Sequence, residues 1–226
     1  AESSQFVILF DDSLAIELGA QVFGSVADVF INADGFKKSI SAPGAGNYLT
    51  MARALASARA LVGERAVREN SFVQAHGTGT PQNRVTESHV LNEVAKQFGI
   101  DSWPVVAVKN YLGHSIGVAA GDQLAVTLGI WEDGILPGIT SIDQIADDVH
   151  ASNLAINNRH TERDPNDFDV AIVNAKGFGG NNASATIISP QLTNKILKAK
   201  HRGQFGSSYQ SSLSTVSYTH LTLPTS

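Results

Sequence analysis

The sequence SFVQAHGTGTP at residues 71–81 decides the fold class, because it contains a strand, a turn and the start of a helix in succession. Its apolar first half predicts a buried strand. His76 and the glycines beside it form the turn. Thr80 and Pro81 are then typical of a helix start, with threonine as the N-cap and proline at the first helical position. A strand that passes through a turn into a helix is the repeating unit of α/β folds.

The same alternation extends outward along the chain. Further strands are predicted at residues 5–10, 21–31, 105–108, 170–173 and 183–188. Helices are predicted at residues 47–62, 81–98, 115–131 and, as a basic surface helix, 191–202, and residues 14–19 are predicted to form a short helix or a turn. The run QFVILF at residues 5–10 is expected to be a buried strand. This order of elements predicts a layered α/β domain that ends in a strand pair.

The composition excludes several classes of function. Of the 226 residues, 42% are hydrophobic and 16% are charged, which suits a large core and argues against disorder. A net charge of −5 without a long basic run argues against nucleic acid and membrane surfaces as partners, and no apolar run reaches membrane-spanning length. The chain has no cysteine, so it holds no disulfide, no zinc–thiolate site and no cysteine nucleophile. We predict no metal, no cofactor and a cytoplasmic location.

Two clusters of polar residues follow predicted strands, where α/β folds place functional groups. In the first cluster, the imidazole of His76 can move a proton or donate a hydrogen bond to a developing oxyanion. In the second, KNYLGH at residues 109–114, the interior position of Lys109 requires a partner, for which Glu87 is the best candidate. His114 is expected at a helix N-terminus, where the helix dipole disfavours its protonation. The alternative interpretation of the first cluster is a purely structural turn, and that of the second is a purely structural ion pair.

A third cluster, GFGGNN at residues 177–182, joins the last two predicted strands. Glycines on both sides of Phe178 suit a loop that moves an aromatic ring as a gate. Backbone amides in such a loop can also stabilise an oxyanion. A simple hairpin turn remains an alternative, whereas a phosphate-binding loop is disfavoured because a strand follows it.

Together and in this order, HGTGTP, K-x-x-x-G-H and GFGG-x-N resemble the β-ketoacyl synthases of the thiolase superfamily. The likeness covers about residues 1–190 and implies the C-terminal half of a thiolase-like, layered α-β-α fold. Residues 191–214 then form a C-terminal extension, and residues 215–226 a non-native or disordered tail. The nucleophilic cysteine of this family lies in the N-terminal half, so the resemblance implies a fragment that is inactive alone.

The resemblance also implies a reaction, the decarboxylative Claisen condensation of malonyl-carrier-protein with an acyl primer in fatty acid or polyketide synthesis. His76 and His114 would stabilise the enolate of the malonyl thioester, and Lys109, paired with Glu87, would position them. The other implied roles are a gating loop of Gly177, Phe178, Gly179 and Gly180, and substrate contacts from Thr78, Thr80 and Asp34. The loop at residues 34–41 would form a second mobile wall.

The implied partners are an acyl carrier protein that bears malonyl or acyl groups, the missing N-terminal half, and a second copy in a homodimer. Two alternatives remain. The chain can be a non-catalytic partner such as the chain-length factors of polyketide systems, although these commonly lose the catalytic residues that are kept here. It can also be a binding domain whose motifs are only turns. The residue at the nucleophile position upstream would distinguish an enzyme from a partner subunit.

Overall fold

The computed structural model describes residues 1–35 and 44–202. The predicted wall at residues 34–41 lies largely outside the described residues. The tail at 215–226 and the second half of the extension at 191–214 also lie outside them. Within the described part, none of the helices is long and apolar enough to cross a membrane.

A mixed sheet of six strands forms the middle of the described structure, in the order β1-β8-β7-β2-β3-β5. Its strands are β1 (Ser25–Ala33), β2 (Ser71–Gln74), β3 (Trp103–Val106), β5 (Leu154–Ala155), β7 (Val170–Gly177) and β8 (Asn181–Ile188). Strands β7, β2, β3 and β5 run parallel to one another, whereas β8 pairs antiparallel with both β7 and β1. A small second sheet pairs β4 (Ile135–Leu136) with β6 (Thr161–Glu162).

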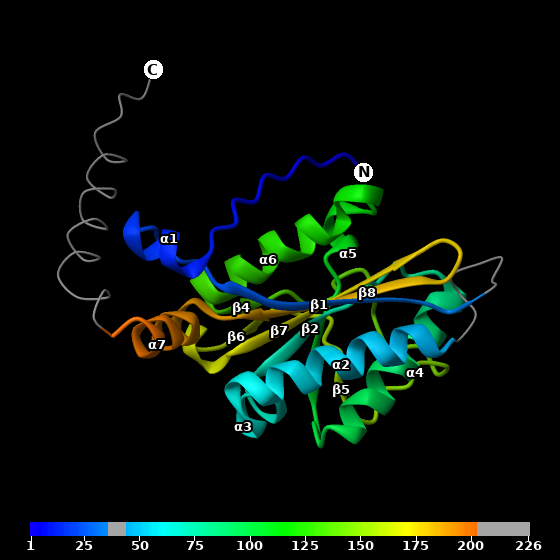
Figure 1. Ribbon diagram of the computed structural model, residues 1–226. Helices are drawn as coiled ribbons and strands as arrows, with labels where there is room; N and C mark the ends of the chain where they lie inside the picture. Colours follow the sequence, from blue (N-terminus) through cyan, green and yellow to red (C-terminus); the bar gives the residue numbers. More distant parts are fainter. Residues whose placement is uncertain (36–43, 203–226) are drawn as a thin grey trace.

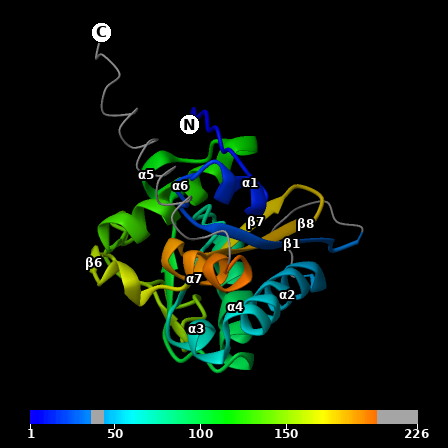
Figure 2. The ribbon, with the colours of Figure 1, turned by 60° about the vertical axis from the view of Figure 1, so that its left-hand side comes forward.

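Helices cover both faces of the large sheet (Figure 1). On one face lie α2 (Ala45–Val62), α3 (Glu64–Arg68) and α4 (Pro81–Gln97), and on the other α5 (Lys109–Leu112) and α6 (Ala119–Asp133). Two further helices, α1 (Asp12–Glu17) and α7 (Pro190–Lys200), lie together at one end of the sheet (Figure 2). This layering confirms the predicted α/β fold class.

Strand β2 shows why the sheet has a core on each face, since all four of its residues are buried. Val73 packs into the cluster formed with α2 and α4, whereas Phe72 belongs to the cluster on the α6 side. There the Phe72 ring makes edge contacts with Trp131 and Phe168, at centroid distances of 6.1 and 5.3 Å. The two polar residues of the strand, Ser71 and Gln74, are buried as well, and they donate hydrogen bonds to the carbonyl of Val67 and to the hydroxyl of Thr127.

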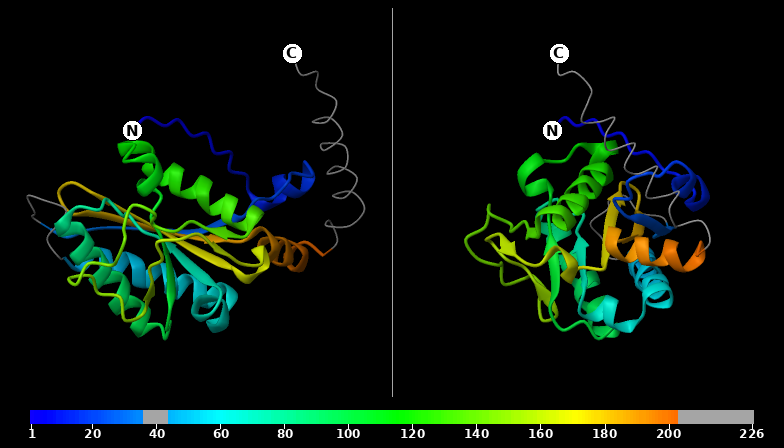
Figure 3. Two further views of the ribbon diagram at one scale, coloured as in Figure 1. Left: turned by 180° about the vertical axis from the view of Figure 1, so that it is seen from behind. Right: turned by 90° about the vertical axis from the view of Figure 1, so that its left-hand side faces the viewer.

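The strand predicted at residues 5–10 is wrong. This segment is irregular and passes beside α6, with Phe6, Ile8 and Leu9 exposed by 94%, 78% and 73% (Figures 1 and 3). A strand needs a neighbour to pair its backbone groups, and no described strand pairs with this run. The run is apolar, as a buried strand requires, but the described residues offer it no strand to pair with.

The helix predicted at residues 115–131 begins later, at Ala119. Before it, Gly113 has φ +73° and Ile116 has φ +60°, which an α-helix cannot accommodate. A turn therefore separates His114 from the helix that was expected to begin there. This turn determines the geometry of the candidate site.

Candidate active site

His76 lies just past the end of β2 and is only 2% exposed. Its Nδ1 accepts a hydrogen bond from the backbone N–H of Lys176, at 3.2 Å. Because Nδ1 is an acceptor, the neutral ring carries its proton on Nε2. That Nε2 is buried and has no hydrogen-bond partner among the described residues. The end of β2 thus holds a fixed hydrogen-bond donor that is unpaired within the described part of the chain.

The turn after His76 depends on glycine. Gly77 has φ +55°, and a Cβ at this position would lie 3.0 Å from the Cβ of Ala107 at the end of the neighbouring strand β3. Such a backbone conformation and such a close approach both favour glycine. The chain can therefore reverse into α4 while the ends of β2 and β3 stay in contact, which brings the first two clusters together.

His114 faces His76, with ring centroids 5.3 Å apart and ring planes at 82° (edge to face). Its Nδ1 accepts from the backbone N–H of Ile116 at 3.1 Å, so its proton also lies on Nε2. The two predicted histidines are thus neighbours, and both carry the tautomer that donates from Nε2.

Burial keeps both histidines neutral. It lowers the pKa of His76 from 6.5 to about 4, and the charges of Lys109 and Lys176 act in the same direction against an opposing effect of Glu87. Burial and the charge of Lys109 also lower the pKa of His114. The expected cause, a helix dipole acting on His114, is not supported, because α6 begins only at Ala119.

Lys109 contacts the site differently from the prediction. Its ammonium donates to the backbone carbonyl of His76, at 2.7 Å, and burial lowers its pKa. The ion pairs between described residues do not include one between Lys109 and Glu87, so the predicted pair is wrong, although Glu87 attracts the ammonium from farther away. Lys109 therefore holds the backbone that carries His76.

The carboxylate of Glu87 is 4% exposed and is occupied by hydrogen-bond donors instead. Its Oε1 accepts from the backbone N–H of His76 and from Asn174 Nδ2, at 2.7 and 2.9 Å. Its Oε2 accepts from the backbone N–H of Gly77 and from Asn83 Nδ2, at 2.8 and 2.9 Å. Two donors on each oxygen satisfy the buried charge without a cation, and they fix the turn that follows β2.

Phe178 lies in the tight turn between β7 and β8 and is 82% exposed. Gly179 and Gly180 have φ of +81° and +80°, as the turn requires. The hairpin interpretation of this loop is confirmed, and its action as a gate stays a prediction. Asp34 lies beside the loop: its N–H donates to the carbonyl of Gly180, and its carboxylate accepts from the N–H of Gly46 in the first turn of α2.

A cavity of about 490 Å³ extends from the turn at residues 77–79 and Lys109 along α4. Thr78 lies at its edge, with its hydroxyl 3.3 Å from that of Thr80. The apolar part of the lining consists of Leu91, Val105, Ile139, Ile142, Ile145, Val149, Leu154 and Ile156. Of the two predicted substrate contacts, Thr78 therefore borders the cavity, whereas Thr80 is not among its lining residues. The cavity reaches the candidate site through Gly77 and Lys109, which flank His76 in sequence or contact its backbone.

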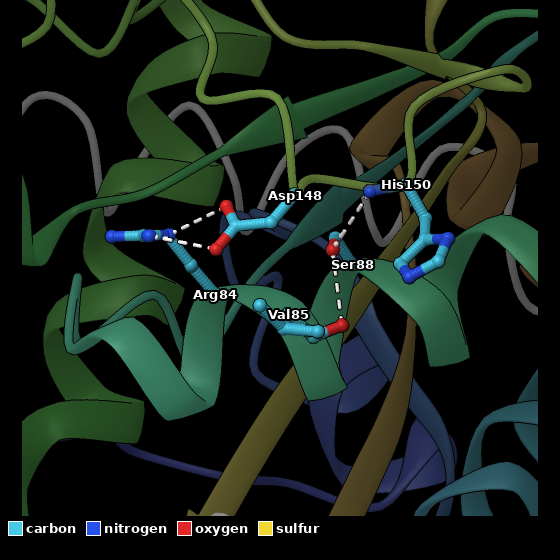
Figure 4. A network of polar contacts seen from close by, with 5 residues as sticks. All are labelled: Arg84, Val85, Ser88, Asp148 and His150. Atoms are coloured by element: carbon cyan, nitrogen blue, oxygen red, sulfur yellow. Dashed lines mark hydrogen bonds and ion pairs between the residues drawn. The ribbon is translucent and has the colours of Figure 1, made fainter.

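The outer wall of this cavity is the irregular segment around residues 139–149, which polar contacts hold against α4 (Figure 4). Arg84 binds both carboxylate oxygens of Asp148, at 2.9 and 2.7 Å. Ser88 accepts from the backbone N–H of His150 at 3.2 Å and donates to the carbonyl of Val85. These contacts hold the wall against α4, and Arg84 and Ser88 themselves line the cavity.

Sequence reasoning missed several polar residues of the site. Asn83 precedes Glu87 by one helical turn, a spacing that could have revealed it. Asn174, Lys176 and Gln123 gave no comparable signal. Gln123 is fully buried and donates to the backbone carbonyls of Gln74 and Ala75 at the end of β2 and to that of Asn174 in the middle of β7. No group of three or more His, Cys, Asp or Glu side chains suited to a metal occurs in the part of the chain that is described.

Comparisons with known proteins identify the family of the chain. The family model of the β-ketoacyl synthase C-terminal domain matches residues 23–143. The chain is 59% identical over 201 residues to the β-ketoacyl-[acyl-carrier-protein] synthase FabY of Pseudomonas aeruginosa, and it covers 32% of that protein with 89% of its own length. It is 26% identical over 167 residues to 3-oxoacyl-[acyl-carrier-protein] synthase 2 of Vibrio cholerae, covering 74% of this chain and 38% of the relative.

The solved structures give the same result. The crystal structure of the noncanonical ketosynthase FabY from P. aeruginosa matches with a TM-score of 0.86 and 53% identity, over 93% of this chain and 32% of that one. The ishigamide ketosynthase/chain length factor matches with a TM-score of 0.62 and 28% identity, over 78% of this chain and 40% of that one. The chain thus spans about a third of the length of the relatives that it matches.

Proposed function

Because the chain belongs to the β-ketoacyl synthase family, as its C-terminal domain, we propose that it supplies the malonyl-handling half of a β-ketoacyl-[acyl-carrier-protein] synthase. One observation carries this proposal: the Nε2–H of His76 is buried, unpartnered and beside the ring of His114, whose Nε2 also carries a proton. Two adjacent neutral donors suit an oxygen that gains negative charge during a reaction.

The proposed reaction begins when both Nε2–H groups donate to the thioester carbonyl of the malonyl group. The bond to the malonyl carboxylate breaks, carbon dioxide leaves, and the electron pair moves onto the thioester oxygen as an enolate. The two donors stabilise this oxygen more strongly than the initial carbonyl, which lowers the barrier. The enolate carbon then forms a bond to the acyl carbon of a cysteine thioester, and the cysteine thiolate leaves.

The cysteine must come from outside this chain, which contains none. We therefore propose that residues 1–190 act together with an N-terminal half that supplies the nucleophile, and that the complete protein is a homodimer. The acyl carrier protein would deliver malonyl and acyl groups, with Thr78 and Thr80 contacting the pantetheine arm. Phe178 and its neighbouring glycines would gate the acyl path. The exposure of the Phe178 ring supports this role, because nothing described here restricts its movement.

A chimera tests the proposal. In this FabY chimera, residues 1–202 replace the matching C-terminal third of P. aeruginosa FabY, so that the FabY portion supplies the nucleophile. We expect the purified chimera to release carbon dioxide from malonyl-carrier-protein and to form a β-ketoacyl product, whereas the isolated chain forms none. A folded chimera that is inactive would contradict the proposal and favour a non-catalytic partner subunit. Condensation by the isolated chain would contradict the dependence on a missing half.

The pH dependence of the chimera follows from the neutral state of the histidines. Both rings must be unprotonated at Nδ1 to accept from the backbone, and the pKa of each is lowered, that of His76 from 6.5 to about 4. A lowered pKa means that protonation begins at lower pH than in free imidazole. We expect the midpoint of the acid limb of the decarboxylation rate to lie below pH 6.5, the pKa of an unperturbed histidine. An acid limb at or above 6.5 in a folded enzyme would contradict this assignment.

A further inference from the structure

The carboxylate of Asp122, in the first turn of α6, is 2% exposed and accepts hydrogen bonds from three side chains. Its Oδ2 accepts from the hydroxyl of Ser115, the residue that follows His114. Its Oδ1 accepts from the hydroxyl of Ser3 and, at 3.1 Å, from the side-chain amide of Gln5. Asp122 therefore ties the turn of His114 both to α6 and to the first residues of the chain, which lie along this helix (Figure 3).

The turn that Asp122 holds is strained. Ile116 is the only non-glycine residue with positive φ among those described, at +60°, and its side chain is 74% exposed. A β-branched residue in this region is a true outlier, and such strain persists only where surrounding contacts enforce it. Because the Ile116 side chain is exposed, its packing cannot stabilise this conformation. The contacts that hold the turn must therefore come from neighbouring residues. The hydrogen bond from Ser115 to Asp122 lies directly beside it.

This strained backbone conformation has a chemical consequence for His114. It points the N–H of Ile116 at His114 Nδ1, at 3.1 Å, and thereby places the proton of the neutral ring on Nε2. If the turn relaxed, Nδ1 would lose its donor and the ring would be free to rotate or to change tautomer. The position of the Nε2–H of His114 thus depends on the conformation of the turn, and the turn is held by the hydrogen bond from Ser115 to Asp122.

We propose that Asp122 is a positioning residue for His114, acting through Ser115 to hold the strained turn that fixes the Nε2–H tautomer. This inference rests on the proposed function, since it concerns the second donor to the malonyl thioester. A carboxylate suits the task because it accepts from all three neighbours at once. The hydrogen bond from Ser115 lowers the pKa of Asp122, which keeps the carboxylate ionised.

The test compares variants of the FabY chimera. Asp122→Ala and Ser115→Ala should each lower kcat for malonyl decarboxylation by about 10-fold or more with little change in KM, because the donor is misplaced while the substrate still binds. Both should also move the acid limb of the kcat profile to higher pH, because the N–H that opposes protonation of His114 Nδ1 is lost. The other groups that act on His114 are His76, Lys109 and the α-amino group of Ala1, and both variants retain them.

Ser3→Ala is the matched control, since it removes a donor to Asp122 but leaves the contact with Ser115. It should leave the rate and the acid limb unchanged. If Asp122→Ala fails to fold, Ser115→Ala decides alone. A folded Ser115→Ala chimera with an unchanged rate and acid limb would overturn the proposal, and so would a Ser3→Ala chimera that shows the same loss. If the proposed function itself were wrong, His114→Ala would not change the rate of malonyl decarboxylation. This result distinguishes that failure from a failure of the role of Asp122 alone.

Discussion

Replacing His76 by alanine in the FabY chimera is expected to slow malonyl decarboxylation by about 10²–10³-fold, the usual effect of removing one donor to a developing oxyanion. The side chain that is lost carries the buried Nε2–H, which has no hydrogen-bond partner among residues 1–35 and 44–202. Its backbone contacts with Glu87 and Lys109 do not involve the ring, so alanine keeps them. The variant should therefore fold and bind substrate while losing stabilisation of the enolate.

His150→Ala is the matched control for this substitution. His150 is exposed and contacts Ser88 through its backbone N–H, which alanine retains (Figure 4). Carbon dioxide release from malonyl-carrier-protein would be measured for both variants, with circular dichroism to establish folding. The control should match the parent within about a factor of two, because a surface side chain away from the site has little effect. A folded His76→Ala chimera that decarboxylates at the parental rate would contradict the assigned role.

The sequence was sufficient for the layered fold because its strands and helices are specified locally. The residues at 71–81 contain their own strand pattern, glycine turn and helix start, and the structure has each of them. The run at residues 5–10 has an equally strong apolar pattern but remains irregular. A β-strand forms only when a neighbouring strand pairs with its backbone, so a local apolar pattern does not by itself predict a strand.

The candidate site was predictable only in part, for a similar reason. His76 and His114 each follow a strand, and neighbouring parallel strands bring their ends together, so their proximity could be anticipated. The hydrogen-bond donors to Glu87 could not be predicted, because a buried carboxylate accepts from whichever donors the turn and the sheet place beside it. Asn174 is such a donor and lies 87 residues away along the chain. Neither periodicity nor motif spacing reports a contact of this kind.

The second large effect is expected for Glu87→Gln, which should destabilise the FabY chimera by about 2–6 kcal/mol. Glutamine has nearly the shape of glutamate, yet one of its terminal groups is an NH₂ donor. Each oxygen of Glu87 accepts from two donors, so the amide group faces two of them in either orientation. Leaving a buried donor unpaired costs about 1–3 kcal/mol, and here two are left.

Glu69→Gln is the control for the same chemical change, because the Glu69 carboxylate is exposed and forms an ion pair with Arg65 of α3, at 3.0 Å. An exposed pair of this spacing contributes about 0.3–0.5 kcal/mol, so its loss should barely alter chemical denaturation of the chimera. Equal stability of the two variants would show that the donors around Glu87 find other partners. If the turn then still holds His76 in place, decarboxylation would also be preserved. A loss of both stability and rate in Glu87→Gln alone would instead identify the carboxylate as the group that fixes the backbone of His76.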